Sequence, residues 1–104
     1  MSSGYALHPE AFADLDDIRG YIAQENPDAA DRVISEIFDG IRGLVPFPHL
    51  GHRRPDLSSR PLRFTLVREY LIAYAPDEKP LWVVAVMHGR RNPRIMATIL
   101  RVRQ

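Results

Sequence analysis

The sequence predicts an α+β domain: a three- to four-stranded antiparallel sheet with an N-terminal α-helical hairpin packed on one face. Two observations lead to this prediction. Residues 9–44 repeat apolar side chains every three to four positions, as amphipathic helices do, with one break at Asn26-Pro27. Residues 62–88 are instead rich in β-branched and aromatic side chains and are divided by short turns, as consecutive strands are.

Length and composition fit one compact globular domain over residues 1–104. Hydrophobic residues make up 45% of the 104 positions and charged residues 26%, which excludes collagen-like and wholly disordered chains. No apolar run approaches the ~20 residues of a membrane-spanning helix, and no secretory signal is visible, so we expect a cytoplasmic protein without membrane contact. The absence of cysteine excludes disulfides, thiolate metal sites and cysteine nucleophiles.

Proline marks the expected start of each helix. Pro9 and Pro27 suit first helical positions, and Asn26 is a good N-cap. In the first helix the apolar stripe leaves Asp14, with its acidic neighbours, on the outer face. The link between the two helices is only a few residues, so they should fold back as an antiparallel hairpin, and Pro46 should end the second helix.

Three strands are expected after a long loop. The loop, residues 46–61, contains four prolines and carries His49, His52, Arg53 and Arg54, and loops of this length are usually functional or mobile. The strands are then predicted at Leu62–Val67, Tyr70–Ala75 and Leu81–His88. A tight hairpin should turn at Arg68-Glu69. Tyr5–His8 is a possible fourth strand, and residues 93–104 form a basic C-terminal helix or tail.

The second and third of these strands are apolar on both faces, whereas a sheet with one wet face should alternate. The helical hairpin can cover one face only. The other must be covered by the C-terminal segment, by a second copy of the chain or by a partner chain, and the sequence leaves these three open.

Charge is divided unevenly along the chain. The net charge is +1 overall, but residues 1–39 carry a net −7 and residues 40–104 a net +8. The chain should therefore have an acidic side and a basic side, and the basic side could meet nucleic acid or an acidic protein segment. Thirteen of the fourteen basic residues are arginine, which contacts carboxylate and phosphate in a planar, bidentate way.

Six short motifs occur along the chain in a recognisable order. They are Leu15-x-x-Ile18-x-x-Tyr21-Ile22, Asn26-Pro27-x-Ala29-Ala30-x-Arg32, Leu44-x-x-x-Pro48-x-x-Gly51, Leu62-Arg63, Tyr70-Leu71-Ile72-x-Tyr74 and Val86-x-His88-Gly89-Arg90-Arg91. With this order and spacing the chain resembles the RelE/ParE superfamily of bacterial type II toxins over nearly all of residues 5–92.

The resemblance implies one of two activities. RelE-type members are ribosome-dependent mRNA endonucleases (mRNA interferases) that place basic residues on the sheet and a Tyr or His near the C-terminus. ParE-type members share the fold but are linked to inhibition of DNA gyrase, with no accepted catalytic set. Members of both branches are neutralised by an antitoxin. For ParE this is typically a ParD-like ribbon-helix-helix protein whose C-terminal tail wraps the toxin.

RNA cleavage would need a general base, a general acid and cationic stabilisation of the transition state. The available bases are His49, His52, His88 and Glu69, and the cations include Arg60, Arg63, Arg90 and Arg91. Arg63, His88 and Arg90 would be the catalytic set. The lysines and the terminal Tyr or His of RelE-type enzymes are missing, so an mRNA interferase is the alternative hypothesis. A third alternative is a member that binds an antitoxin-like partner and is not toxic.

The motifs and the resemblance therefore favour a ParE-like toxin that inhibits gyrase, arrests growth and serves plasmid stabilisation. The spacing of His49 and His52, with His88 as a third ligand, could chelate a metal, but no nearby carboxylate or cysteine supports this, so no cofactor and no metal are expected. The toxin–antitoxin hetero-oligomer should bind operator DNA through the antitoxin. Residues expected to contact the antitoxin or the target are Arg63, Arg68, Tyr70, Tyr74, Trp82, His88, Arg90 and Arg91.

Overall fold

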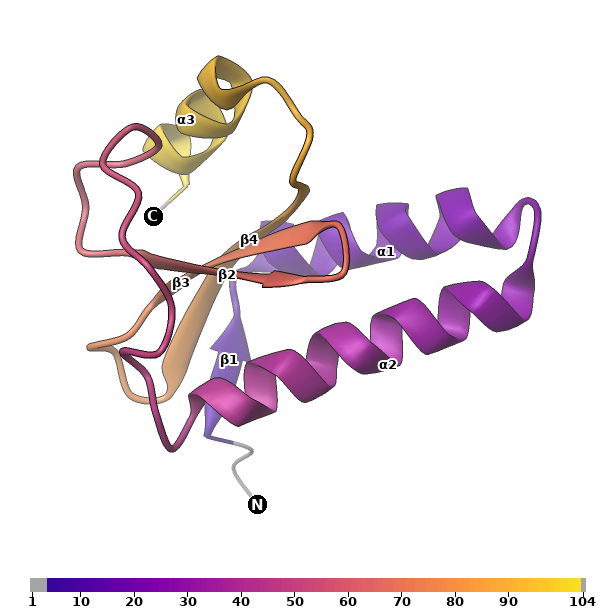
Figure 1. Cartoon of the computed structure of the whole chain (residues 1–104), viewed down its shortest axis with the longest axis horizontal. Coiled ribbons are helices and arrows are strands. Elements are labelled where there is room, and N and C mark those ends of the chain that lie inside the picture. Colours follow the sequence, from indigo (N-terminus) through magenta and orange to yellow (C-terminus); the bar gives the residue numbers. More distant parts are fainter. Residues whose placement is uncertain (1–3, 104) are drawn as a thin grey trace.

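The computed structural model describes residues 4–103, and its three helices and four strands confirm the predicted α+β class (Figure 1). In chain order the elements are β1 (Tyr5–Leu7), α1 (Pro9–Ala23), α2 (Pro27–Leu44), β2 (Arg63–Val67), β3 (Tyr70–Ala75), β4 (Leu81–His88) and α3 (Pro93–Val102). The strands form one sheet in the order β1-β4-β3-β2. No helix in the described range has both the length and the apolar character to cross a membrane.

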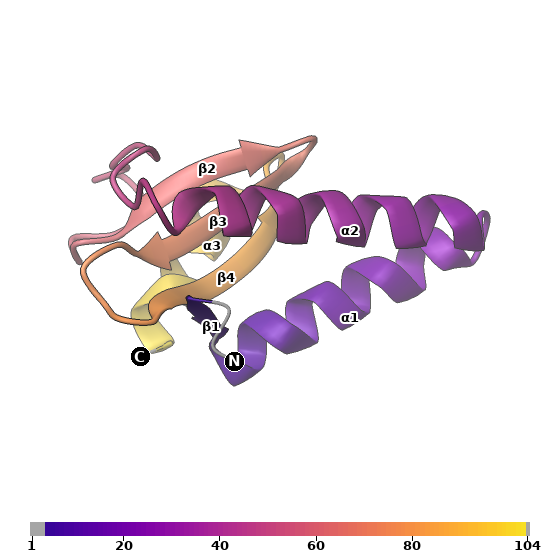
Figure 2. The same ribbon diagram turned by 90° about the horizontal axis from the view of Figure 1, so that it is seen from below.

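The helical hairpin is confirmed, and its ends are where the sequence placed them. Proline occupies the first turn of both helices. The side chains of His8 and Asn26 each accept a backbone N–H of the first turn at 3.0 Å, which satisfies a donor that the helix itself cannot. Figure 2 shows α1 and α2 lying side by side along one face of the sheet and extending beyond its end.

The sheet is mixed rather than wholly antiparallel. β2, β3 and β4 form the predicted antiparallel meander, with Val67 paired to Tyr70 across a two-residue turn. β1 pairs with β4 in parallel, Ala6 opposite Trp82. Parallel neighbours need a long crossover. Here the hairpin, the loop and two strands separate β1 from β4, so the N-terminal strand enters the sheet on the far edge and in the parallel sense.

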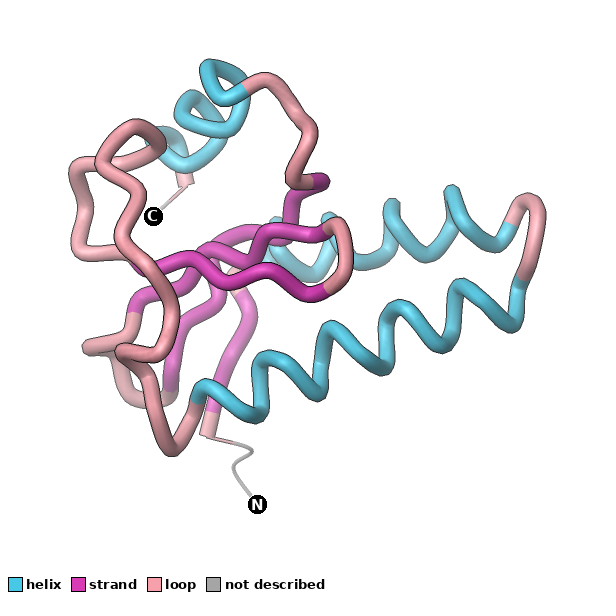
Figure 3. Tube along the Cα trace, in the orientation of Figure 1, coloured by secondary structure: helices cyan, strands magenta, loops and turns pink. Residues whose placement is uncertain are grey.

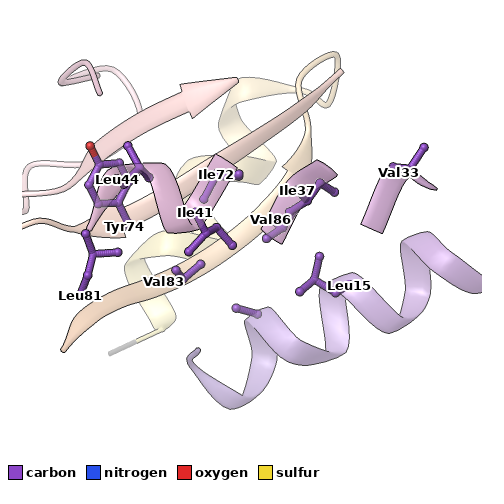
Figure 4. Close-up of a cluster of buried hydrophobic side chains, with 11 residues drawn as sticks. Leu15, Val33, Ile37, Ile41, Leu44, Ile72, Tyr74, Leu81, Val83 and Val86 are labelled. Carbon is purple, nitrogen blue, oxygen red and sulfur yellow. The ribbon is translucent and has the colours of Figure 1, made fainter. Parts of the chain in front are cut away.

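One core lies between the helical hairpin and the sheet (Figure 4). Ile37 and Ile41 of α2 are fully buried there against Ile72, Val83 and neighbouring strand residues. The apolar stripe read from the sequence of α2 is thus the stripe that faces the sheet.

A second core lies on the sheet face opposite the helical hairpin, and it shows which segment covers that face. Met96 and Leu100 of α3, with Leu57 of the 46–61 loop, pack on Val84 and Met87. Figure 3 shows the helix and the loop on the side of the sheet away from the hairpin. Of the three possible covers, the C-terminal segment is therefore the one observed, together with the loop. The chain seals both sheet faces with its own residues.

Two glycines offer a direct test of the helical assignment. An added Cβ at Gly20 or Gly43 would meet nothing within 4 Å, and neither residue has a positive φ. We expect Gly20→Ala and Gly43→Ala each to raise the free energy of unfolding by about 0.5–1 kcal/mol, measured by urea denaturation. Gly40→Ala is the control, because its Cβ would lie 2.5 Å from Val67 Cγ2. A gain in stability for Gly40→Ala, or a loss for the other two, would contradict the packing of the hairpin.

Candidate functional site

A polar cluster forms where the β2–β3 turn meets the end of β4. The His88 Nε2 lies 3.1 Å from the Glu69 Oε2, and the His88 Nδ1 accepts the backbone N–H of Arg90 at 3.1 Å. The Tyr70 ring meets the imidazole edge-on, with the centroids 5.5 Å apart. Strand pairing sets this arrangement, because Tyr70 lies opposite His88 in the β3–β4 register.

These contacts occupy both nitrogens of His88. Since Nδ1 accepts an N–H, the proton of the neutral ring is on Nε2 and is donated to Glu69. A general base needs a free lone pair within reach of the substrate proton. His88 therefore acts in this structure as a link between the turn and the following loop, with no lone pair left for a substrate.

The loop after β4 presents two free cations. Arg90 and Arg91 are exposed, and within residues 4–103 neither guanidinium hydrogen-bonds or pairs with a carboxylate. The loop itself is held in place, because the backbone N–H of Gly89 donates to the Glu69 carbonyl at 2.7 Å. The result is a pair of arginines on a fixed backbone, available to a carboxylate or phosphate of another molecule.

Arg68, by contrast, is committed to an internal ion pair. Its guanidinium donates twice to the Glu36 carboxylate, at 2.8 and 2.7 Å. These bonds lower the pKa of Glu36 and raise that of Arg68. Arg68 also has a φ of 54°, a backbone conformation that a tight two-residue turn requires. The pair ties the β2–β3 turn to α2.

The expectation that Tyr74 contacts a partner is wrong. Its side chain is fully buried in the core under the hairpin. The hydroxyl accepts the N–H of Gly51 at 2.9 Å and donates to the Pro48 carbonyl at 2.7 Å, which anchors the long loop to the sheet. Burial raises the pKa of Tyr74. Tyr70 is only partly buried. Its pKa is raised mainly by that burial and, to a smaller extent, by the negative charge of Glu69.

Arg63 lies at the other end of the sheet from His88. It pairs with Tyr74 across β2 and β3 and donates to the Gly51 carbonyl at 2.8 Å. Its register position on β3 is Tyr74 and that of His88 is Tyr70, four positions or about 13 Å apart along the strand. The predicted catalytic set is thus divided: His88 and Arg90 are neighbours, and Arg63 is not with them.

Trp82 faces the second core with Phe64, on the sheet face opposite to Tyr70 and Tyr74. It is partly exposed, and its ring lies 5.8 Å from that of His8. This position at the β1 end of β4 is far in register from the cluster around His88.

The remaining candidates serve the fold. Arg60 donates to the carbonyls of Leu100 and Arg103, at 2.9 and 2.5 Å, and so closes the C-terminal end of α3. His49 pairs with Asp77 at 3.3 Å, and the backbone of His52 bridges to β2. In the described part of the chain, no three His, Asp or Glu side chains converge on a point that could hold a metal.

Comparison with known proteins agrees with this architecture. The family model described as the ParE toxin of the type II toxin-antitoxin system, parDE, matches residues 5–93. The chain belongs to the ParE toxin family. It is also 30% identical over 89 residues to the protein named "Putative toxin Y4kP" of Sinorhizobium fredii (strain NBRC 101917 / NGR234), an alignment that covers 79% of this chain and 84% of that protein.

The family resemblance read from the sequence is therefore confirmed, and a ParE-type toxin implies an antitoxin partner. Sequence reasoning missed one exposed feature of this ParE-family chain, a groove between the 46–61 loop and β2 flanked by Leu50 and Leu66. Leu66 lies on the same strand face as the buried Phe64, but it is exposed because the loop pairs with β2 only at Phe64. The sequence does not show how far the loop follows the strand.

Proposed function

We propose that this ParE-family chain is a cytoplasmic toxin that inhibits DNA gyrase, arrests growth and is neutralised by a ParD-like ribbon-helix-helix antitoxin. It acts by binding through its basic side and holding gyrase on cleaved DNA, with no covalent step of its own. The hetero-oligomer with the antitoxin binds operator DNA through the antitoxin and serves plasmid stabilisation.

The separation of Arg63 from His88 is the observation that carries this choice over mRNA cleavage. A transesterification site needs its base, acid and cation within hydrogen-bond reach of one phosphate. Here about 13 Å of strand separates Arg63 from His88, whose two nitrogens are already hydrogen-bonded. A binding role needs only what the 89–91 loop offers, which is exposed arginine on a fixed backbone.

The charge pattern supports the direction of binding. The outer faces of α1 and α2 carry most of the acidic residues, and only part of them is paired with arginine, as in Arg19–Asp31 and Arg42–Asp39. This side repels nucleic acid and acidic peptides. The free arginines Arg90 and Arg91 lie instead on the loop between β4 and α3, so a gyrase–DNA complex or an acidic antitoxin tail should approach there.

Expression of the chain without its antitoxin tests the proposal. We expect growth arrest with DNA breaks that disappear in a host with a toxin-resistant gyrase, and intact mRNA on ribosomes. The variant Arg90→Ala/Arg91→Ala should lose this toxicity, because it removes both free cations and leaves the fold unchanged. Arg32→Ala, an exposed arginine on the acidic face of α2, is the matched control and should stay toxic.

Each other result has a definite meaning. Cleaved ribosomal mRNA without DNA breaks would replace the proposal with the mRNA interferase alternative. Normal growth at a verified level of folded protein would replace it with the non-toxic binding alternative. Full toxicity of Arg90→Ala/Arg91→Ala would remove these two residues from the target site.

A further inference from the structure

β2 is an edge strand, and part of its outer edge is open. Val67 and Tyr70 close the two-residue turn, so the hydrogen-bonding groups of the odd-numbered residues of β2 face β3. Those of Phe64 face outward and exchange two bonds with His52, at 2.8 and 2.7 Å. By the same alternation the N–H and C=O of Leu66 face outward too.

The 46–61 loop pairs with β2 at Phe64, through His52, but not at Leu66. No backbone or side chain of residues 4–103 lies in hydrogen-bond contact with the outward groups of Leu66. A strand edge with an unpaired N–H and C=O is a template for an incoming strand. The two bonds between Phe64 and His52 already show the register that such a strand would continue.

An apolar groove runs along this open edge. It has a volume of about 290 Å³, and Leu50 and Leu66 flank it with 67% and 63% of their surface exposed. The buried Leu71 and Phe64 form its base. Because strand side chains alternate, a segment paired with Leu66 would direct every second side chain into this groove.

Free cations stand at one end of the groove. At the loop end the groove is lined by Arg54, whose guanidinium already donates to the Asp56 carboxylate at 3.0 and 2.9 Å. At the other end, a Cβ on Gly89 would lie 3.5 Å from the Leu66 side chain, which places the Arg90-Arg91 loop beside Leu66. An occupant with an apolar stretch, and with acidic residues at the end beside Arg90 and Arg91, would match this groove.

We propose that the open edge of β2 receives an extended segment of the antitoxin as an additional strand, through backbone bonds to Leu66. The segment is apolar at alternate positions and acidic at the end that lies beside Arg90 and Arg91. This inference rests on the proposed function, since it assigns the surface that the antitoxin occupies. It also gives Arg90 and Arg91 a second role, so that a bound antitoxin hides the arginines offered to the target.

Amide hydrogen exchange measured by NMR tests this strand addition, with the cognate antitoxin, identified as the protein whose co-expression restores growth, as the probe. In the free toxin the Leu66 amide should exchange fast, like an unpaired edge amide. In the purified complex it should slow by about a hundredfold or more, as amides in a sheet ladder do. Binding through side chains alone would leave its rate unchanged.

Two variants at position 66 distinguish the contribution of the backbone N–H to antitoxin binding from that of the leucine side chain. Leu66→Ala keeps the outward N–H, whereas Leu66→Pro removes it, and proline is tolerated on edge strands whose N–H faces outward. We expect Leu66→Pro to bind the antitoxin about tenfold more weakly than Leu66→Ala. Val102→Ala, another exposed apolar residue, is the control and should bind as the wild type does.

The results distinguish this inference from the function on which it rests. A tight, neutralising complex with a fast-exchanging Leu66 amide would overturn the strand addition and leave the toxin–antitoxin function standing. Protection of Leu66 in the isolated toxin that rises with concentration would assign the edge to a second copy and overturn the inference. Failure of the antitoxin to bind or neutralise the chain would overturn both.

Discussion

Asp14→Ala is expected to lower the free energy of unfolding by about 3–5 kcal/mol, because it breaks a buried ion pair. Asp14 is part-buried on α1 and accepts two hydrogen bonds from Arg103, at 2.6 and 2.9 Å. Arg103 is itself buried, at 9% exposure. Removing the carboxylate would leave a charged guanidinium inside the protein without its partner.

The Asp14–Arg103 pair also closes the edge of β4 that β1 leaves uncovered, on the side of the sheet opposite β2. β1 covers β4 only as far as Val83, and beyond that point Asp14 accepts the N–H of Val86 at 3.0 Å while Arg103 donates to the carbonyl of Val84 at 3.1 Å. β4 also has a bulge here, because Val84 and Ala85 both face the second core. Side chains thus take the place of a neighbouring strand, and this edge, unlike that of β2, is not open.

Thermal and urea denaturation of Asp14→Ala would measure the loss. Asp17→Ala, an exposed acid on the same helix, is the control and should change stability by less than about 0.5 kcal/mol. The double variant Asp14→Ala/Arg103→Ala should lose less than the two single losses added together, because each removes the same interaction. A loss below about 1 kcal/mol for Asp14→Ala would show that the pair does not hold the edge.

The local elements of the fold were predictable because their signals are local. Pro9 and Pro27 mark helix starts whatever the rest of the chain does. The change from helical to strand-like patterning after Pro61 predicted the meander, and the two-residue spacing of Arg68 and Glu69 predicted its turn.

What the sequence did not show depends on residues far apart along the chain. Asp14 looked like one more acid on the outer face of a helix, and only the fold brings Arg103 to it from 89 positions away. The partner of Tyr74 likewise comes from the loop, at Gly51. The parallel direction of β1 depends on how the hairpin, the loop and two strands connect it to β4, which is a property of the whole topology.

The candidate site divides in the same way. The free Arg90 and Arg91 follow from a local motif and are exposed as expected. Arg63 and His88 were grouped by residue type, although strand register places them at opposite ends of the sheet. The open edge at Leu66 escaped notice because it depends on how far the loop follows β2, which no residue type signals.

Leu100→Ala is expected to cost about 2–5 kcal/mol of unfolding free energy, the usual range for truncating a fully buried leucine. Leu100 is 0% exposed and packs with Met96 against the strand face opposite the hairpin. Its carbonyl also accepts the Arg60 guanidinium at 2.9 Å, so the same turn of α3 holds both an apolar and a polar contact with the body of the protein.

The size of this effect separates two views of the C-terminus. If α3 were a basic tail resting on a sheet that another molecule normally covers, truncating Leu100 would change the unfolding midpoint no more than the exposed control Val102→Ala, by less than about 0.5 kcal/mol. If α3 completes the core, unfolding stays a single transition at a lower midpoint, and dye-binding apolar surface does not increase in the native state. We expect the second result, because α3 and the loop already bury Val84, Ala85 and Met87. The sheet face under α3 is then already covered by the chain's own residues and offers no free docking surface.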